Sequence, residues 1–463
     1  MKRREFGFLT GSSAMGWVMG GQGARANGTP GLGPGLTAFG SEIAGNKAGT
    51  IPAYTGGLTG IPDGMTWDPT KTLPPDFFAQ DKMLYQVDAD NMAQYAHLLS
   101  DGLQELIKKT GFEVRVYPTR RTAAYPQFVL DNIAKNITRA KLDPQGGRLG
   151  FSGGFCGIPF PIPDISDPYN AGVQLVYNHE TRWAGTYVHN NTGSFVVQGG
   201  RAPALASAGP SNFYFPYYDP NMDPQNYDGL LYKVQNVSTG PATTIGDEFV
   251  QWYYINSLQT PVKTWQVLAG QGRVRRAPDV QYDTPSSYVD GVANYDEYNG
   301  FNGAANEYDW KLLGKRGMLI PYNNNKIYSA RVEQIFTPKF PNPDYIRWEL
   351  HRCWVVEATL HPGERNVMAR RRLYIDEDIW QIGIIDTWDA NGVPYHHNFS
   401  VNANFPNLPG TLYQDNYVFN LQTGDYCNMQ GNFADAAYAR PWIFKPVSQS
   451  VFDPQTIAAT AAY

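Results

Sequence analysis

The chain has 463 residues, 42% of them hydrophobic, which is enough for one large β-rich domain or two smaller domains. Charged residues make up only 17% and the net charge is −5, a balance that argues against a nucleic-acid partner. The aromatic content of 14%, with 30 Tyr, 47 Gly and 34 Pro, favours many strands and structured loops over helical bundles. After the N-terminus, no apolar run approaches the ~20 residues that a membrane-spanning helix needs.

The N-terminus has the pattern of an export signal. A Lys-Arg-Arg run at positions 2–4 precedes a mildly apolar stretch to about Gly21, and Ala-Arg-Ala at 24–26 offers a small-x-small cleavage site. We predict that residues 1–26 form a twin-arginine-type signal peptide rather than a basic tail. This predicts a protein of the periplasm of a Gram-negative bacterium, soluble after cleavage near Ala26, without a lipid anchor because no Cys stands at the cleavage point.

The mature chain begins with a Gly/Pro-rich stretch, 27–64, which has no periodicity and is predicted to lie extended over the surface. Helical spacing of apolar residues then predicts three helices, at 91–110, 127–142 and 168–178. Asp90 is the expected cap of the first helix and Gly111 its expected end. From about 182 to 270, short Tyr-rich runs separated by turn residues predict an antiparallel sheet. Residues 272–325 are predicted to be mostly loop, with one strand at 318–320.

Three consecutive strands, at 346–360, 366–376 and 379–388, predict an antiparallel meander. Along the first strand, Trp348, Leu350, Trp354 and Val356 share one parity, so they point to one face. Such an aromatic-rich face lies inside a protein, either as packed core or as the wall of a cavity. A last strand is predicted at 413–421, followed by a Pro-rich tail at 440–463. Because no linker or repeat interrupts this order, we predict a single domain over 27–463.

Several long motifs resemble one bacterial family over nearly the whole mature chain. They are AGNKAGTIPAYTGGL, VYPTRRTAAYP, GIPFPIP, RRAPDVQYDTP and RRLYIDEDIW, and together they resemble domain-of-unknown-function family 1329 (DUF1329). The resemblance implies an α+β, mainly antiparallel fold similar to the Lol-type periplasmic lipoprotein carriers and receptors (LolA/LolB-like). That fold is a large curved, incompletely closed β-barrel with helices packed in its concave face and an apolar cavity. The resemblance also implies an inner-membrane exporter and an outer-membrane protein as partners, and it supplies no catalytic residue.

A cavity in such a fold would be lined from the meander. The predicted ligand-binding residues are Trp348, Leu350, Arg352, Trp354, Val356, Arg371, Arg372, Tyr374 and Trp380. From the residues alone, packed core is the favoured interpretation of this face, because most buried aromatic side chains pack against protein. The Arg clusters at 120–121, 275–276 and 370–372 are expected to pair with acidic side chains across strands, or else to bind anionic head groups. Arg371 or Arg372 is the best candidate for a ligand contact.

No pattern predicts catalysis, a metal site or a cofactor. The Asp-Glu-Asp run at 376–378 is predicted to be a solvated turn, the His pair at 396–397 to lie in a loop, and His179 to end a helix. The three cysteines, Cys156, Cys353 and Cys427, are compatible with one disulfide and a free thiol, or with three separate thiols. We therefore predict a periplasmic binding or carrier protein for a hydrophobic, lipid-like ligand. The alternative is a periplasmic enzyme or glycan-binding protein with exposed, coplanar aromatic rings beside carboxylates.

Overall fold

The computed structural model describes residues 31–460 except 146, 148–149, 269–273, 277–281 and 304, so the predicted signal peptide lies outside the described residues. The strands are β1 (Tyr85–Val87), β2 (Val114–Val116), β3 (Lys141–Leu142), β4 (Phe151–Ser152), β5 (Tyr187–Val197), β6 (Ala204–Tyr214), β7 (Leu230–Val237), β8 (Glu248–Tyr254), β9 (Lys263–Val267), β10 (Val274–Arg276), β11 (Tyr308–Pro321), β12 (Trp348–Leu360), β13 (Arg370–Asp376), β14 (Ile382–Trp388), β15 (Pro394–Phe405), β16 (Gly410–Asn420) and β17 (Tyr426–Asn428). The α-helices are α1 (Met92–Tyr95), α2 (Asp101–Thr110), α3 (Gln127–Arg139), α4 (Pro168–Glu180), α5 (Val332–Ile335) and α6 (Pro454–Thr460).

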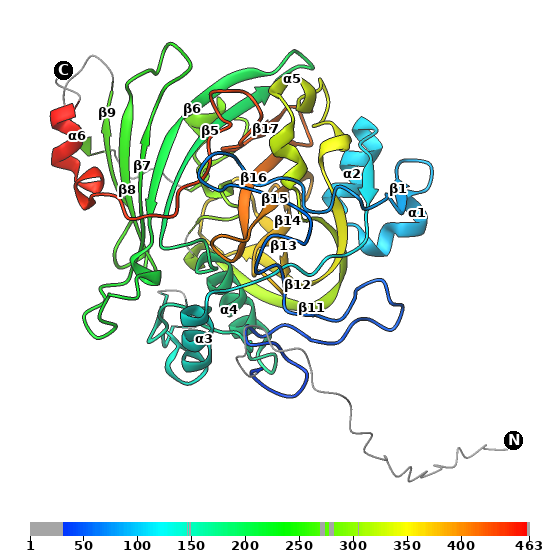
Figure 1. The fold of residues 1–463 in the computed structure, drawn as a ribbon, viewed down its shortest axis with the longest axis horizontal. Helices are drawn as coiled ribbons and strands as arrows, with labels where there is room; N and C mark the ends of the chain where they lie inside the picture. The colour runs from blue at the N-terminus through cyan, green and yellow to red at the C-terminus, as the bar shows by residue number, and fades with distance from the viewer. Residues whose placement is uncertain are drawn as a thin grey trace, which may run out of the picture.

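One large sheet organises the molecule (Figure 1). Its strands follow the order β1-β2-β12-β13-β14-β15-β16-β17-β5-β6-β7-β8-β9-β10, and β11 also pairs with β12. Every pairing is antiparallel except the single contact of β12 with β2. The ends of this order, β1 and β10, do not pair with each other in the described part of the chain. The sheet therefore curves without closing, and the predicted fold class, a mainly antiparallel, incompletely closed barrel, is confirmed.

The meander is present as predicted. The chain pairs β12 with β13 and β13 with β14, so that Glu357, Arg372 and Asp386 lie side by side across the three strands. The positive charge of Arg372 attracts the carboxylates of Glu357 and Asp386 on either side of it, which stabilises this register. Of the flanking strands, β11 was predicted only over 318–320, and β15 was not predicted. In β11, Gly314 has a φ of 131° and lies beside a register shift, so it interrupts the alternation of side chains along the strand. In β15, most residues are polar, so the strand lacks a clear apolar face in the sequence.

The helices begin close to the predicted positions. The predicted helix 91–110 is divided, because Leu99 is extended and the Ser100 side chain accepts a hydrogen bond from the Leu103 N–H, which caps α2. Gly111, with φ of 77°, ends α2 as expected. In α4, the Asp167 carboxylate accepts from the N–H groups of Tyr169 and Asn170.

The helices lie on different sides of the sheet. The consecutive residues His396 and His397 of β15 point to opposite faces: the ring of His397 bonds Asp386, which also accepts from the N–H of Gly102 in α2. The ring of His396 bonds Glu297 at 2.9 Å. Glu297 precedes the loop that lines the space between the half of the sheet formed by β12 to β17 and the half formed by β5 to β10. Helix α2 contacts β14 and β15 on the face that carries Asp386 and His397.

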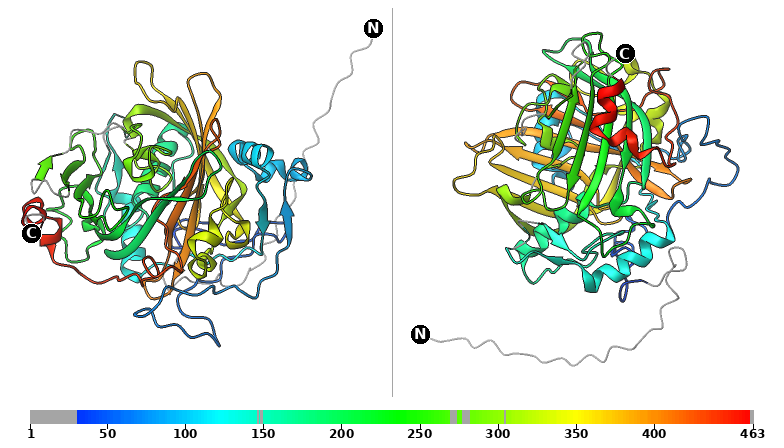
Figure 2. Two further views of the ribbon diagram at one scale, coloured as in Figure 1. Left: turned by 90° about the horizontal axis from the view of Figure 1, so that it is seen from above. Right: turned by 90° about the vertical axis from the view of Figure 1, so that its left-hand side faces the viewer.

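The C-terminal segment, predicted to be a tail, contains a 3₁₀ turn at Gln449–Phe452 and helix α6. Figure 2 (right) shows α6 lying across the outer face of the half of the sheet formed by β5 to β10. The indole N–H of Trp252 in β8 donates to the carbonyl of Phe452 at 3.1 Å. At the other end, residues 31–64 contain no helix and no strand, as their composition predicts. The division of the chain into a signal peptide and a single domain stays a prediction.

Candidate ligand-binding cavity

The nine predicted ligand-binding residues lie in packed surroundings. Trp348 is fully buried against Phe112 and Phe399, with ring centroids 6.1 and 5.3 Å away. Trp380 is fully buried, and its indole N–H donates to the carbonyl of Phe39. Trp354 is half-buried beneath the Lys315 ammonium, 4.2 Å from the ring centroid. Val356 and Tyr374 are buried and Leu350 is half-buried. Ligand binding by any of these side chains stays a prediction.

The predicted arginines are paired with carboxylates. Arg352 contacts Glu377 at 2.9 Å and Arg372 contacts Glu357 at 2.7 Å, while the fully buried Arg371 bonds Asp296. Cross-strand or loop acids thus neutralise each of them. This is the alternative that the sequence favoured over anionic head groups.

The acidic run at 376–378 is not a solvated turn; that prediction is wrong. Asp376, Glu377 and Asp378 are all buried, because Arg121 pairs with Asp378 at 2.6 Å and Lys315 pairs with Glu377 at 2.8 Å. Here burial is tolerated because each charge has an opposite partner. Oxygens of Asp376 and Asp378 and a ring nitrogen of His351 lie within 4.8 Å of one another, but Arg121 already occupies Asp378. The cluster is therefore an ion-pair network.

The structure also places the histidines and cysteines singled out in the sequence. His351 lies between Asp376 and Glu349. Burial alone would lower the pKa of its ring, but hydrogen bonds that the ring donates to these two carboxylates raise the pKa to about 9. His396 and His397 lie in a buried strand rather than a loop, so that prediction is wrong. His179 does lie in the last turn of a helix, α4, and its Nδ1 accepts from the N–H of Ile382. The three cysteines are all buried and free, so no disulfide forms among them.

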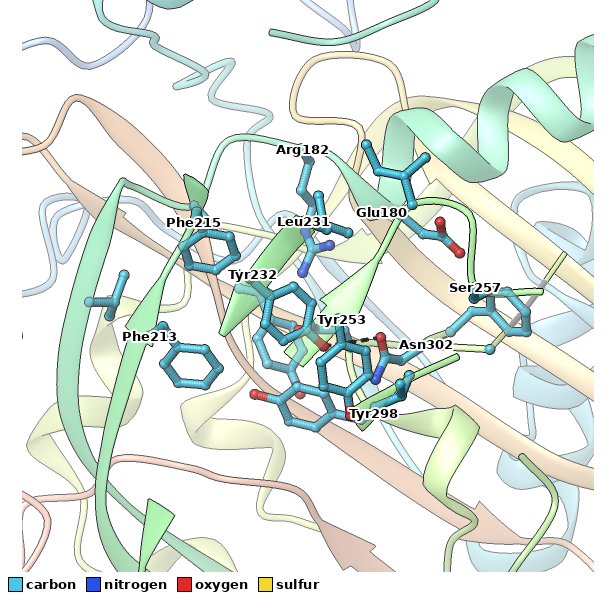
Figure 3. A pocket seen from close by; sticks show the side chains of 18 of the residues that line it. Glu180, Arg182, Phe213, Phe215, Leu231, Tyr232, Tyr253, Ser257, Tyr298 and Asn302 are labelled. Carbon is cyan, nitrogen blue, oxygen red and sulfur yellow. Dashed lines mark hydrogen bonds between the residues drawn. The ribbon is translucent and has the colours of Figure 1, made fainter. Parts of the chain in front are cut away.

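A cavity opens between the two halves of the sheet, on the side where α4 ends (Figure 3). Its volume is about 110 Å³. Its wall comes from α4, from β5 to β8, from the loop after residue 297 and from β16. Among the side chains that line it are Glu180, Arg182, Ala184, Asn190, Phe213, Phe215, Leu231, Tyr232, Tyr253, Ser257, Tyr298, Asn299, Asn302, Tyr413 and Gln414.

Aromatic rings form a large part of this wall. Tyr232 stacks on Tyr253 with centroids 4.3 Å apart, and Phe215 lies 5.5 Å from Tyr232. Phe213 and Phe215 alternate along β6 and the residues just after it, so both point to the same side. The cavity continues along β7 and β8, because the neighbouring hollow shares Phe213, Tyr232 and Tyr253 with it. The result is an elongated, ring-lined space.

The hydroxyl groups of the wall are neutral hydrogen-bond donors. Burial raises the pKa of Tyr232 and of Tyr298 above the ordinary tyrosine value, so neither ionises at neutral pH. Tyr232 donates to the amide oxygen of Asn302 at 3.3 Å, and Tyr298 donates to that of Gln430 at 2.6 Å. These two hydrogen bonds fix the positions of the Tyr232 and Tyr298 hydroxyl groups.

A β-bulge shapes the wall formed by β16. In the pairing of β15 with β16, Val401 faces Asp415 and Asn402 faces Tyr413, which leaves Gln414 as the extra residue. Such a bulge re-aims side chains, and here the consecutive residues Tyr413 and Gln414 both line the cavity. Gln414 is only 2% exposed, yet neither atom of its amide has a partner within the described residues.

Within the described residues, the wall also contains one carboxyl group, on Glu180, and one guanidinium, on Arg182. Burial raises the pKa of Glu180 to about 8, although the nearby Arg182 opposes this shift. Burial lowers the pKa of Arg182 to about 10, so its guanidinium stays charged at neutral pH. Both side chains are partly exposed, and that exposure is toward the cavity that they line. In Figure 3 the guanidinium points down beside Tyr232, and the carboxyl group points toward Ser257.

Fold and cavity together define a curved, open antiparallel sheet with an aromatic-lined cavity between its halves. Among the described residues, no helix is both long and apolar enough to cross a membrane. The profile of the family described as protein of unknown function (DUF1329) matches residues 86–458. The chain belongs to this family.

The chain is similar to one bacterial protein in sequence and to several crystal structures in fold. The uncharacterized protein PA3922 of Pseudomonas aeruginosa is 34% identical over 365 residues, which cover 78% of this chain and 78% of that protein. A DUF1329 family protein from Desulfovibrio piger has a crystal structure similar to this chain with a TM-score of 0.43 and 14% identity, covering 63% of this chain and 99% of the other. A LolA superfamily protein from Nitrosomonas europaea matches with a TM-score of 0.35 and 10% identity, covering 61% and 97%.

Proposed function

We propose that this protein is a periplasmic binding or carrier protein for a hydrophobic, lipid-like ligand that lies in the aromatic cavity. The observation that carries the proposal is the cavity itself. Its volume of about 110 Å³ is smaller than the roughly 300–1000 Å³ of most small-molecule sites, but the cavity continues into the neighbouring hollow along β7 and β8. A wall of rings with a few polar groups is the usual composition of such a site.

The location is supported by the export pattern at the N-terminus. Arg3 and Arg4 are the pair that the twin-arginine pathway reads, so their replacement by Lys is expected to abolish periplasmic accumulation. Mature protein that still reaches the periplasm at a normal level would contradict this route. The proposed partners, an inner-membrane exporter and an outer-membrane protein, come from the resemblance stated above.

Binding fits the cavity better than the alternative of an enzyme or a glycan-binding surface. A sugar-binding platform would present exposed, coplanar rings beside ionised carboxylates. Here the stacked pair Tyr232–Tyr253 lies inside the wall, and the nearest carboxyl group, on Glu180, has a pKa raised to about 8 by burial. Among the described residues of the wall, no histidine or cysteine stands beside a serine or a carboxylate as a nucleophile and base would.

The test is a titration with N-phenyl-1-naphthylamine, an uncharged probe that fluoresces in apolar surroundings. Ala184 lines the cavity, whereas Ala134 is exposed on α3. We expect saturable 1:1 binding to the wild type and to Ala134→Trp, and at least a tenfold loss for Ala184→Trp, whose indole fills the cavity. No saturable binding to the wild type, or equal binding to both variants, would overturn the proposal.

A further inference from the structure

We propose that the ligand is an anionic amphiphile, with a carboxylate or similar acidic group held by Arg182 and an apolar body held by the rings of the cavity. This inference rests on the proposed function and adds the chemical class of the ligand. It starts from the placement of one cation, because a buried guanidinium is costly unless an anion or several acceptors surround it.

Arg182 has an unusual position for a deep arginine of this protein. Its Nη1 donates to the carbonyl of His179 at 2.8 Å, a carbonyl in the last turn of α4 that also accepts from the backbone N–H of Arg182. Its guanidinium also lies over the ring of Tyr413, 5.9 Å from the centroid. In the part of the chain that the structure describes, no carboxylate oxygen lies within 4.0 Å of it, whereas Arg121 and Arg371 both have one. Several of its N–H groups are therefore left for a ligand.

A second observation points to a polar group at the same place. Gln414 and Asn190, which are 98% and 94% buried, line the same cavity. Among the described residues, the amide nitrogen and oxygen of Gln414 and the side-chain oxygen of Asn190 have no hydrogen-bond partner. Buried polar groups normally have partners, so these atoms are suited to a ligand head group or to the water around it. Gln414 adjoins Tyr413, the residue beneath the guanidinium.

The charge balance of the wall also favours an anion. The only carboxyl group of the described wall belongs to Glu180, and burial raises its pKa to about 8, so it is mostly neutral at pH 7. The tyrosines of the wall are neutral as well. With Arg182 charged, an acidic group would enter a site that holds one unbalanced positive charge. The rest of the wall combines aromatic rings and apolar side chains with neutral amides, so the body of the ligand is expected to be largely hydrophobic.

The experiment compares two ligands of equal chain length, dodecanoate and 1-dodecanol, each displacing N-phenyl-1-naphthylamine at pH 7. The proteins are the wild type, Arg182→Gln, and the control Arg201→Gln, which removes an exposed arginine. Urea unfolding of each protein establishes that the variants are folded. For the wild type and the control, we expect dodecanoate to bind at least tenfold more tightly than dodecanol. For Arg182→Gln, we expect dodecanoate to lose that advantage while dodecanol stays within about twofold.

Each outcome separates the head-group inference from the proposed function. If both ligands bind the wild type equally and Arg182→Gln changes neither, the inference is overturned while hydrophobic binding stands. If Arg182→Gln weakens both ligands alike, Arg182 only supports the cavity wall, and the inference also fails. If neither ligand nor the probe binds the wild type, the proposed function fails first. Arg182→Lys distinguishes charge from geometry, since it keeps the charge and should retain part of the preference for dodecanoate.

Discussion

Replacing Gln414 by Leu should stabilise the protein and weaken its binding of an acidic ligand. The two side chains have similar size, and neither polar atom of Gln414 has a protein partner among the described residues. A buried polar group without a partner costs about 1–3 kcal/mol, part of which water in the cavity relieves. We therefore expect Gln414→Leu to raise the free energy of unfolding by about 1 kcal/mol. Losing a hydrogen bond to a charged head group should weaken dodecanoate binding by roughly tenfold.

Asn428 provides the matched control. It is fully buried, donates to Gly193 and Asp415, and accepts from the N–H of Phe195. Asn428→Leu removes three hydrogen bonds, each worth about 1 kcal/mol, so it should destabilise the protein by about 3 kcal/mol. The assay is urea unfolding of both variants, with dodecanoate displacement of the fluorescent probe. The reasoning is refuted if Gln414→Leu costs 1 kcal/mol or more, or if it leaves dodecanoate binding unchanged.

Three further outcomes are expected. The pKa of Glu180 is raised from 4.5 to about 8, so the folded state keeps a proton that the unfolded state loses. Stability should therefore fall by up to about 1.4 kcal/mol per unit as pH rises through that interval, and Glu180→Gln should flatten the slope; an unchanged slope would contradict this. The pKa of His351 is raised from 6.5 to about 9, so its contribution should be complete below pH 6.5 and lost as pH rises through 9. Unfolding of His351→Gln at pH 6 and pH 9 should show a difference from wild type that shrinks at the higher pH. No thiol should react with an aromatic disulfide reagent before unfolding, because all three cysteines are buried; rapid reaction of one would show that its surroundings open.

The meander could be predicted from the sequence because its strands alternate in the ordinary way between turns of Pro, Gly and Asn. β15 could not, since residues such as His396 and Asn398 look solvated until Glu297, distant in sequence, lies beside them. The same is true of Asp378, whose charge is tolerated in the interior only because Arg121 meets it. Sequence periodicity predicts which face of a strand a side chain points to. It does not predict which charged residue, distant in the sequence, will lie beside a buried polar or charged side chain.

The cavity was missed for a related reason. The strongest aromatic pattern, at Trp348 and Trp354, belongs to a strand whose side chains pack against Phe112, Lys315 and helix α4. The residues that line the cavity come from several separate segments, and no one segment contains more than a few of them. One signal was present: Phe213 and Phe215 alternate in a Tyr-rich region, and Arg182 stands alone just after a predicted helix. The bulge that aims Gln414 inward leaves no mark in the sequence.

Diffraction from a crystal grown with 12-bromododecanoate tests the central claim most directly, because the anomalous signal of bromine locates the apolar end of the ligand. The account predicts one bromine site inside the aromatic cavity, near Tyr232 and Tyr253 or further along β7 and β8. It also predicts density for the carboxylate at the guanidinium of Arg182. A bromine site against Trp348 and Trp354 of the meander, or no ordered bromine at saturating ligand, would contradict it.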